Sequence, residues 1–247
     1  MLSKLLLFLI SSLMVTSVLA EDAPSRIGYA FDKKTDELVY TESHYENISA
    51  GLVEKSEVIY KDPSSNIIAK KTANFAVDPF MPEFSLVNNK TGHREQTEYI
   101  EKKSQEKKYK VLFTKTSKGP VKDKTLALPE KGISDAGFDN FIVEHWDELK
   151  AGEVLIREFL IPSQMDFIKF KIYQDSITEI DNEKLRVINI EPKSFLIRAF
   201  AGTTKLYYSE NKPELKRFDG VSNMRDANGD NYKVVIKYEN QIQLVTN

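Results

Sequence analysis

Short runs of alternating apolar and polar residues recur along most of this chain, and they constrain its fold more than any other feature. The clearest run covers residues 232–238, in which lysines separate aromatic and aliphatic residues with a strict period of two. Asn228-Gly229 precedes it, a dipeptide typical of a hairpin turn. Each such run predicts a strand with one face in solvent.

Similar runs fill both halves of the chain. In the first half they predict strands over residues 37–47, 55–60, 67–75, 96–102 and 108–114. Segments rich in Asp, Asn, Pro and Gly separate these strands, and such residues favour turns. In the second half the predicted strands cover residues 154–160, 167–173, 184–190, 195–200, 204–208, 215–218, 232–238 and 241–245.

One segment, at about residues 134–151, has a helical period instead. Ser134 or Asp135 can cap its start, and Gly152 follows its end. Its apolar stripe consists of Phe138, Phe141, Ile142, His145 and Leu149, with Trp146 at the edge. About a dozen strands with one helix predict a mainly β fold, in which a strongly curved antiparallel sheet or half-barrel wraps around the amphipathic helix. We expect residues 21–247 to form a single domain.

Residues 1–20 are predicted to be a cleavable signal peptide. Lys4 precedes an apolar run, and the acidic pair Glu21-Asp22 directly follows the small residue Ala20. The run is short for a membrane span and is interrupted by Ser and Thr, although a retained membrane anchor is the alternative. The chain has no cysteine, so an exported form depends on its core rather than on disulfides. We expect a soluble mature protein without a transmembrane span.

Composition and motifs argue against several classes of function. The chain has 35 basic and 37 acidic side chains, so no global charge attracts nucleic acid. There is no cysteine nucleophile, and the segment from Gly220 to Met224 lacks the second glycine of a hydrolase serine elbow. The segment Asp226–Asp230 mimics part of a calcium loop, but Lys237 stands where the bidentate glutamate belongs, so a hairpin turn is the better interpretation. We assign no catalytic residue and expect no cofactor.

Two pairs of residues allow a metal hypothesis. Glu42 with His44, and His93 with Glu95, each share one face of a strand, and two such strands side by side would offer two imidazoles and two carboxylates. Alternation on a solvent face produces the same pattern, so we predict no metal site. A carboxylate-based envelope hydrolase using Glu42 and an unidentified partner also stays open.

Lysines are concentrated between residues 102 and 124, with Tyr109 and Phe113 among them. This stretch is a candidate docking surface for anionic lipid headgroups or an acidic envelope protein, with Lys107, Lys108 and Lys110 as its test residues. The simpler interpretation is a solvated strand edge in which lysines prevent edge-to-edge pairing.

Three segments resemble an uncharacterised family of exported proteobacterial proteins. They are Gly28–Phe31 with Leu38–His44, the helix Gly137–Leu149, and the closing segment Phe218–Asp226. The resemblance implies a Gram-negative periplasm, but it brings no activity and no catalytic residues. The predicted architecture is also similar, by analogy only, to the half-barrel carriers that move lipids or lipoproteins across the periplasm.

These expectations lead to one preferred function. We expect a non-enzymatic periplasmic protein whose curved sheet binds a lipid or another apolar or amphipathic ligand. Phe138, Phe141, Ile142 and Trp146 would form the helix side of that pocket, although the same residues suit a plain core. The alternative is an envelope assembly or scaffold protein that holds a protein partner through the lysine-rich stretch or a sheet edge.

Overall fold

A single sheet dominates the molecule. The computed structural model describes residues 23–100 and 107–240. Within them, 15 strands form one sheet in the order β8-β7-β6-β5-β4-β3-β2-β1-β15-β14-β13-β12-β11-β10-β9. The sheet is not closed into a barrel, and helices contribute little to the fold. The predicted fold class is therefore confirmed, whereas the predicted signal peptide lies outside the described residues.

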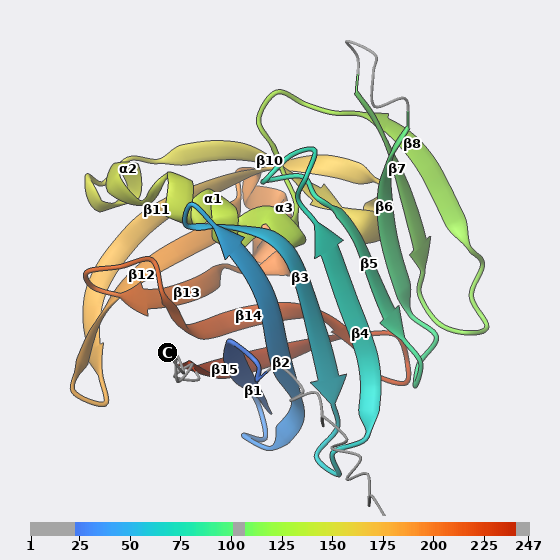
Figure 1. The fold of residues 1–247 in the computed structure, drawn as a ribbon, viewed down its shortest axis with the longest axis horizontal. Coiled ribbons are helices and arrows are strands. Elements are labelled where there is room, and N and C mark those ends of the chain that lie inside the picture. Colours follow the sequence, from blue (N-terminus) through green and yellow to red (C-terminus); the bar gives the residue numbers. More distant parts are fainter. Residues whose placement is uncertain (1–22, 101–106, 241–247) are drawn as a thin grey trace, which may run out of the picture.

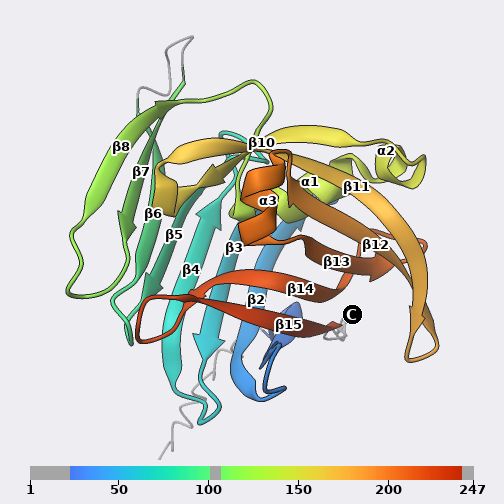
Figure 2. The same cartoon turned by 180° about the vertical axis from the view of Figure 1, so that it is seen from behind.

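We call β1–β8 the first leaf and β9–β15 the second leaf. The first leaf contains β1 (Arg26–Asp32), β2 (Leu38–Ser49), β3 (Leu52–Lys61), β4 (Ile67–Asn74), β5 (Glu83–Asn88), β6 (Arg94–Ile100), β7 (Lys108–Thr114) and β8 (Lys122–Ala127). The second leaf contains β9 (Gly132–Ile133), β10 (Leu155–Ile161), β11 (Asp166–Ile180), β12 (Glu183–Pro192), β13 (Thr204–Ser209), β14 (Leu215–Arg225) and β15 (Asn231–Asn240). Figure 1 shows β2–β4 in front of β14 and β15, and Figure 2 shows the second leaf from its own side.

The two leaves are joined in two ways. The antiparallel pairing of β1 with β15, which sets Arg26 opposite Asn240, makes the leaves one continuous sheet. At the far ends of the sheet, Leu160 and Met165 from the second leaf share a buried apolar cluster with Tyr109 and Leu126 from β7 and β8. The sheet edges thus approach through side chains without strand pairing. As predicted, β14 and β15 form a hairpin, and its turn is closed by Asp226, whose carboxylate accepts two backbone N–H groups.

The central helical segment lies between the two leaves (Figure 1). It consists of a 3₁₀ turn (Asp135–Gly137), α1 (Phe138–Glu144) and α2 (Trp146–Lys150). His145 separates α1 from α2, because its φ of −102° and ψ of 19° are not helical. Ser134 accepts a hydrogen bond from the backbone N–H of Gly137, which caps the first turn.

One predicted strand is wrong. Residues 195–200 belong to α3 (Phe195–Ala201), which connects β12 to β13. The segment is a short apolar run without polar alternation, and such a run fits a buried strand and a short helix equally well. Gly202 ends the helix at a φ of +73°, a conformation that favours glycine.

Four strands were not among the predicted ones, namely β1, β5, β8 and β9, and the predicted strand over residues 241–245 lies outside the described residues. β8 lies in the lysine-rich stretch, and five of its six residues are exposed, so its sequence has little apolar alternation to read. None of the helices in the described part of the chain has the length and apolar character needed to cross a bilayer.

Candidate functional site

The helix residues predicted to line a pocket all lie in the apolar interior. Phe138, Phe141, Ile142 and Trp146 are buried and belong to one cluster with the second leaf. Phe138 contacts the ring of Phe159, with centroids 6.3 Å apart. The main second-leaf members of this cluster are Leu155, Ile172, Ile188, Ile190, Leu206, Tyr208 and Leu215. The structure therefore brings all four predicted residues together against a continuous apolar surface.

Two hydrogen-bond donors inside this cluster have no partner. Trp146 and Tyr208 meet edge to face, with ring centroids 5.7 Å apart. Neither Trp146 Nε1 nor the Tyr208 hydroxyl has a hydrogen-bond partner among the described residues. Burial raises the pKa of Tyr208 well above its ordinary value of 10, so the hydroxyl keeps its proton at neutral pH. Both groups can therefore donate to an oxygen acceptor placed beside them.

This pair differs from the other buried side chains with an unpaired atom. Tyr208 and Trp146 each have a single polar side-chain atom, so each makes no side-chain hydrogen bond at all. The others bond or form an ion pair through a second atom; they are Arg26, His93, Asn189, Glu214 and Arg217.

The opposite side of the helical segment makes polar contacts with the first leaf. Arg26 on β1 donates to Asp139 on α1 over 3.0 Å. Asn140 bonds the backbone of Val53 twice, accepting from its N–H at 2.8 Å and donating to its carbonyl at 2.9 Å. Lys71 on β4 forms an ion pair with Asp135 in the 3₁₀ turn. We call these contacts the polar latch.

Arg26 joins the latch to a buried ionic network on β2. It forms an ion pair with Glu46 at 3.4 Å and approaches His44 Nδ1 at 3.3 Å. His44 Nε2 lies 3.0 Å from Glu42, whose carboxylate also accepts from the Tyr238 hydroxyl at 3.1 Å. Burial lowers the pKa of Arg26, but the nearby carboxylates outweigh it and raise that pKa above its ordinary value. Arg26 is therefore a permanent cation at the centre of this network.

The two strands of the metal hypothesis are not neighbours. β2 and β6 are separated by β3, β4 and β5, so the two His–Glu pairs do not face each other. His93, which directly precedes β6, instead places Nε2 3.2 Å from a carboxylate oxygen of Glu95 and 3.3 Å from Arg225 Nε. The described residues contain no group of three or more His, Asp or Glu side chains suited to a metal ion.

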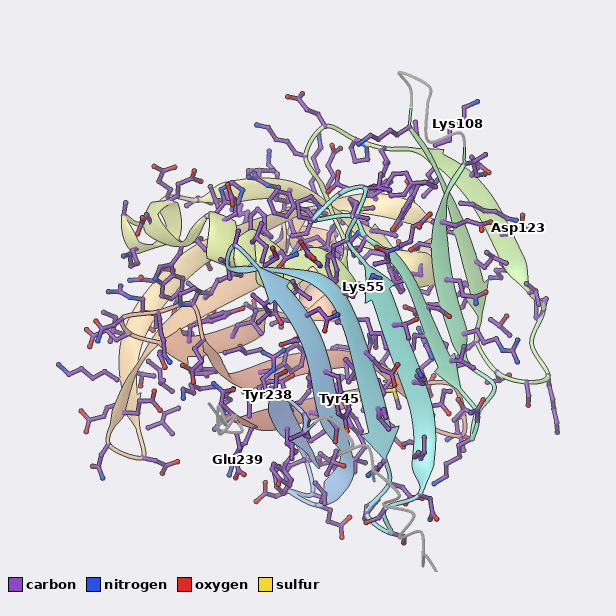
Figure 3. All side chains as sticks on the ribbon, in the orientation of Figure 1. Tyr45, Lys55, Lys108, Asp123, Tyr238 and Glu239 are labelled. Carbon is purple, nitrogen blue, oxygen red and sulfur yellow. The ribbon has the colours of Figure 1, made fainter. Side chains whose placement is uncertain are left out.

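A groove of about 920 Å³ lies on the outer face of the first leaf, over β2–β7. Figure 3 labels Tyr45 and Lys55 at its β2–β3 side. Its three glutamates all have partners: Glu57 pairs with Lys70, Glu98 with Lys110, and Glu83 accepts from a backbone N–H. Glu42 is not among the lining residues, because it points into the interior. The groove therefore does not provide the carboxylate pair that includes Glu42.

The three candidate docking lysines do not share one surface. Lys108 and Lys110 lie on the same face of β7, and Lys110 Nζ is 3.5 Å from Glu98 at the groove border. Lys107 Nζ lies 6.0 Å from the buried ring of Tyr99 instead. Figure 3 shows Lys108 beside the strand that carries Asp123, which is the edge strand β8. Lysines of the predicted stretch that precede residue 107 lie outside the described residues.

Sequence reasoning missed Arg26, Asp139 and Tyr208. Asp139 stands on the predicted helix, but no local pattern connects it to Arg26, which is 113 positions away. Tyr208 ends a correctly predicted strand, and its missing hydrogen bond depends on neighbours that only the tertiary structure defines.

Comparisons with known proteins leave the chain unassigned. No protein-family model matches the sequence, and no curated protein matches it. Among solved structures, the chain is similar to a beta-barrel-like protein of domain of unknown function DUF1849 from Brucella abortus. That similarity has a TM-score of 0.39 and 9% identity, and it covers 89% of this chain and 98% of the other. At these values it assigns neither a family nor an activity.

Proposed function

We propose that this chain is an exported periplasmic protein that binds an amphipathic ligand, an acyl chain with an oxygen-bearing head, inside its curved sheet. Binding is non-enzymatic. Helices α1 and α2 cover the ligand site, and Phe138, Phe141, Ile142 and Trp146 form its helix side. The resemblance to exported proteobacterial proteins motivates the periplasmic assignment.

The unpaired donors of Trp146 and Tyr208 carry this proposal. Buried polar groups are normally hydrogen-bonded, and leaving one unpaired costs about 1–3 kcal/mol. Here two such groups lie together at an otherwise apolar surface. A carboxyl, ester or phosphate oxygen would accept from both, while its alkyl chain contacts Ile172, Ile188 and Leu206. A purely apolar ligand would leave both donors unpaired, so the proposal commits to an amphipathic one.

Ligand entry requires α1 and α2 to move. In the present conformation the four helix side chains fill the space beside the second leaf, and they line neither the outer groove nor the pocket of about 70 Å³ next to Asp139. The helical segment contacts the second leaf through apolar side chains and the first leaf through the polar latch. A tilt about the latch would separate the helices from the second leaf and uncover its apolar surface.

Trp146 provides the first test, because it is the only tryptophan in the chain. The mature protein is titrated with oleate and, separately, with dodecane, and Trp146 emission is followed. We expect oleate to shift the emission saturably and dodecane to have a much weaker effect. Tyr208→Phe should weaken oleate binding about tenfold by removing one hydrogen bond to a charged group. An emission unchanged by oleate, at concentrations below micelle formation, would refute the proposal.

Native mass spectrometry of protein purified from its own periplasm identifies the natural cargo. A co-purifying acyl species that is lost in Phe141→Leu or Tyr208→Phe, both of which keep the core largely filled, would support the site. The same preparation tests export, since the predicted mature chain begins at Glu21.

The assembly alternative depends on other residues and is separable from ligand binding. Charge reversal at Lys107, Lys108 and Lys110 would remove a bound envelope protein if that alternative holds. These lysines are remote from the cluster of Trp146 and Tyr208, so the same variant should keep full oleate binding.

A further inference from the structure

Helix α3 presents an apolar surface that the described residues do not cover. Phe195 is 70% exposed, Leu196 71% and Ile197 38%, and the three are consecutive. Every other exposed large apolar residue in the described ranges is isolated in sequence; these are Ile48, Ile67, Val121, Val154, Ile177 and Val221. A contiguous exposed apolar patch of this kind marks an interaction site.

The rest of the fold holds α3 in this orientation. Arg198 donates to the buried carboxylate of Glu191 on β12 over 2.6 Å, and Thr203 donates to the other oxygen of Glu191. The Arg198 guanidinium also lies 5.8 Å from the ring of Phe195. The helix is therefore fixed through its polar side, and Figure 2 shows it on the near side of the second leaf.

Lysines surround this helix. Lys171 is directly opposite Glu191, the residue that holds Arg198, so its side chain is on the same face of the sheet as α3. Lys169 shares that face, two residues along the same strand. Lys193 lies two residues before the start of the helix, and Lys205 lies four residues after its end. None of the four lysines forms an ion pair with a described residue.

We propose that α3 docks this protein on a lipid bilayer that carries anionic headgroups. Phe195, Leu196 and Ile197 enter the interface between headgroups and acyl chains, and the four lysines contact anionic phosphates. Three side chains are too few for a stable protein interface, which buries about 1,200–2,000 Å². They are sufficient for reversible interfacial binding when cationic side chains add to the attraction. The proposal does not depend on ligand binding in the interior.

Sedimentation with vesicles tests the docking. The mature protein is mixed with phosphatidylglycerol–phosphatidylethanolamine vesicles or with phosphatidylcholine vesicles. We expect binding to the anionic vesicles that weakens as salt rises and at least about tenfold weaker binding to the zwitterionic ones. The double variant Phe195→Ser/Leu196→Ser should lose at least about tenfold in affinity. The triple variant Lys169→Gln/Lys171→Gln/Lys193→Gln should lose at least about tenfold on anionic vesicles only.

Two matched variants control for these changes. Ile67→Ser replaces an exposed apolar residue elsewhere, at 59% exposure, and should bind as wild type does. Lys34→Gln/Lys55→Gln/Lys90→Gln removes the same number of exposed lysines from the first leaf and its turns, and it should also leave binding unchanged. Circular dichroism and Trp146 emission establish that every variant is folded.

Three results would overturn the docking proposal. One is wild-type protein that stays in the supernatant with anionic vesicles. Another is an α3 variant that still sediments as wild type does. The third is a protein that binds native envelope membranes but does not bind lipid vesicles, and that no longer binds the membranes after they are treated with protease. This result would assign α3 to a protein partner.

Discussion

At the scale of single residues, two buried tyrosines distinguish a structural hydroxyl from one that is available to a ligand. The hydroxyl of Tyr40 lies 2.7 Å from Ser222 Oγ, whereas that of Tyr208 has no partner among the described residues. Tyr40→Phe should therefore cost about 1 kcal/mol in free energy of unfolding, because it leaves Ser222 without this bond. Tyr208→Phe should be neutral or stabilising in the ligand-free protein. Urea unfolding followed by circular dichroism measures both.

The same two substitutions should have the opposite relative effects on the affinity for oleate. Tyr208→Phe is expected to weaken oleate binding, and Tyr40→Phe to leave it unchanged. A Tyr208→Phe variant that is destabilised by 1 kcal/mol or more without ligand would show that its hydroxyl already has a partner, and the ligand site would lose its main support.

Residue spacing predicted the buried face of the helical segment but could not predict the chemistry of the proposed site. Phe138, Phe141 and Ile142 recur at helical spacing, which was sufficient to place them on one buried face. Trp146 on α2 and Tyr208 on β13 are 62 residues apart in sequence, and their side chains come together only in the folded protein. No local sequence pattern predicts that contact.

At the scale of elements, the position of α1 depends on a glycine. A Cβ atom on Gly137 would lie 2.0 Å from the backbone oxygen of Phe80, in the connection between β4 and β5. Gly137→Ala must therefore displace the 3₁₀ turn and α1, at a cost of about 1–3 kcal/mol. Trp146 emission should shift toward that of an exposed indole. At Gly132 the nearest atom to such a Cβ is 3.2 Å away, so Gly132→Ala should cost much less; equal losses would contradict this explanation.

The polar latch should make the helical segment sensitive to acid. Burial raises the pKa of Asp139, but Arg26 outweighs it and lowers that pKa below its ordinary value of 3.8. The unfolded chain therefore binds a proton more readily at this carboxyl than the folded chain does. Its stabilising contribution is present above about pH 4 and is lost as pH falls through the lower folded-state pKa.

Removal of the Asp139 carboxyl should make the free energy of unfolding depend less on pH in the acid range. We expect Asp139→Asn to be less stable than wild type at pH 7 and to lose less further stability between pH 4 and pH 2, measured by urea unfolding at each pH. Asp147 is a suitable control, because its side chain on α2 is 92% exposed and pairs only with Lys150. An Asp147→Asn profile with the same flattening would contradict a specific role for the latch.

Helix α3 marks the limit of prediction at this scale. Its apolar run fits a strand or a helix, and the choice depends on whether neighbouring strands offer it a partner. β12 and β13 pair directly with each other from Leu185–Ser209 to Ile190–Thr204, so the residues between them have no open strand position to fill. The predicted fold class is still correct, because the 15 strands of the described residues form one sheet.

At the scale of the whole molecule, the sheet is an antiparallel meander with two exceptions, the parallel pairing of β9 with β10 and the non-local pairing of β1 with β15. Apart from the pairing of β1 with β15, every neighbouring pair of strands is consecutive in sequence. Hairpin signals such as Asn228-Gly229 predict consecutive pairs, but no local pattern predicts that the first and last described strands meet in the middle of the sheet. This pairing joins the two leaves, and it closes a loop of chain that contains every strand from β2 to β14.

A circular permutation should remove the one pairing between strands that are not consecutive in sequence. Arg26 pairs with Asn240, so a short Gly/Ser linker between residues 240 and 26 would turn β15 and β1 into a hairpin. New termini at residues 129 and 130 would separate β8 from β9, which are already the two sheet edges. Because folding rates rise as contacts become more local, we expect the permuted chain to refold roughly tenfold faster in stopped-flow experiments.

Since the folded contacts are retained, its free energy of unfolding should stay within about 2 kcal/mol of the original. An unchanged refolding rate would mean that the pairing of β1 with β15 forms after the rate-limiting step, and that the two leaves fold first as separate units.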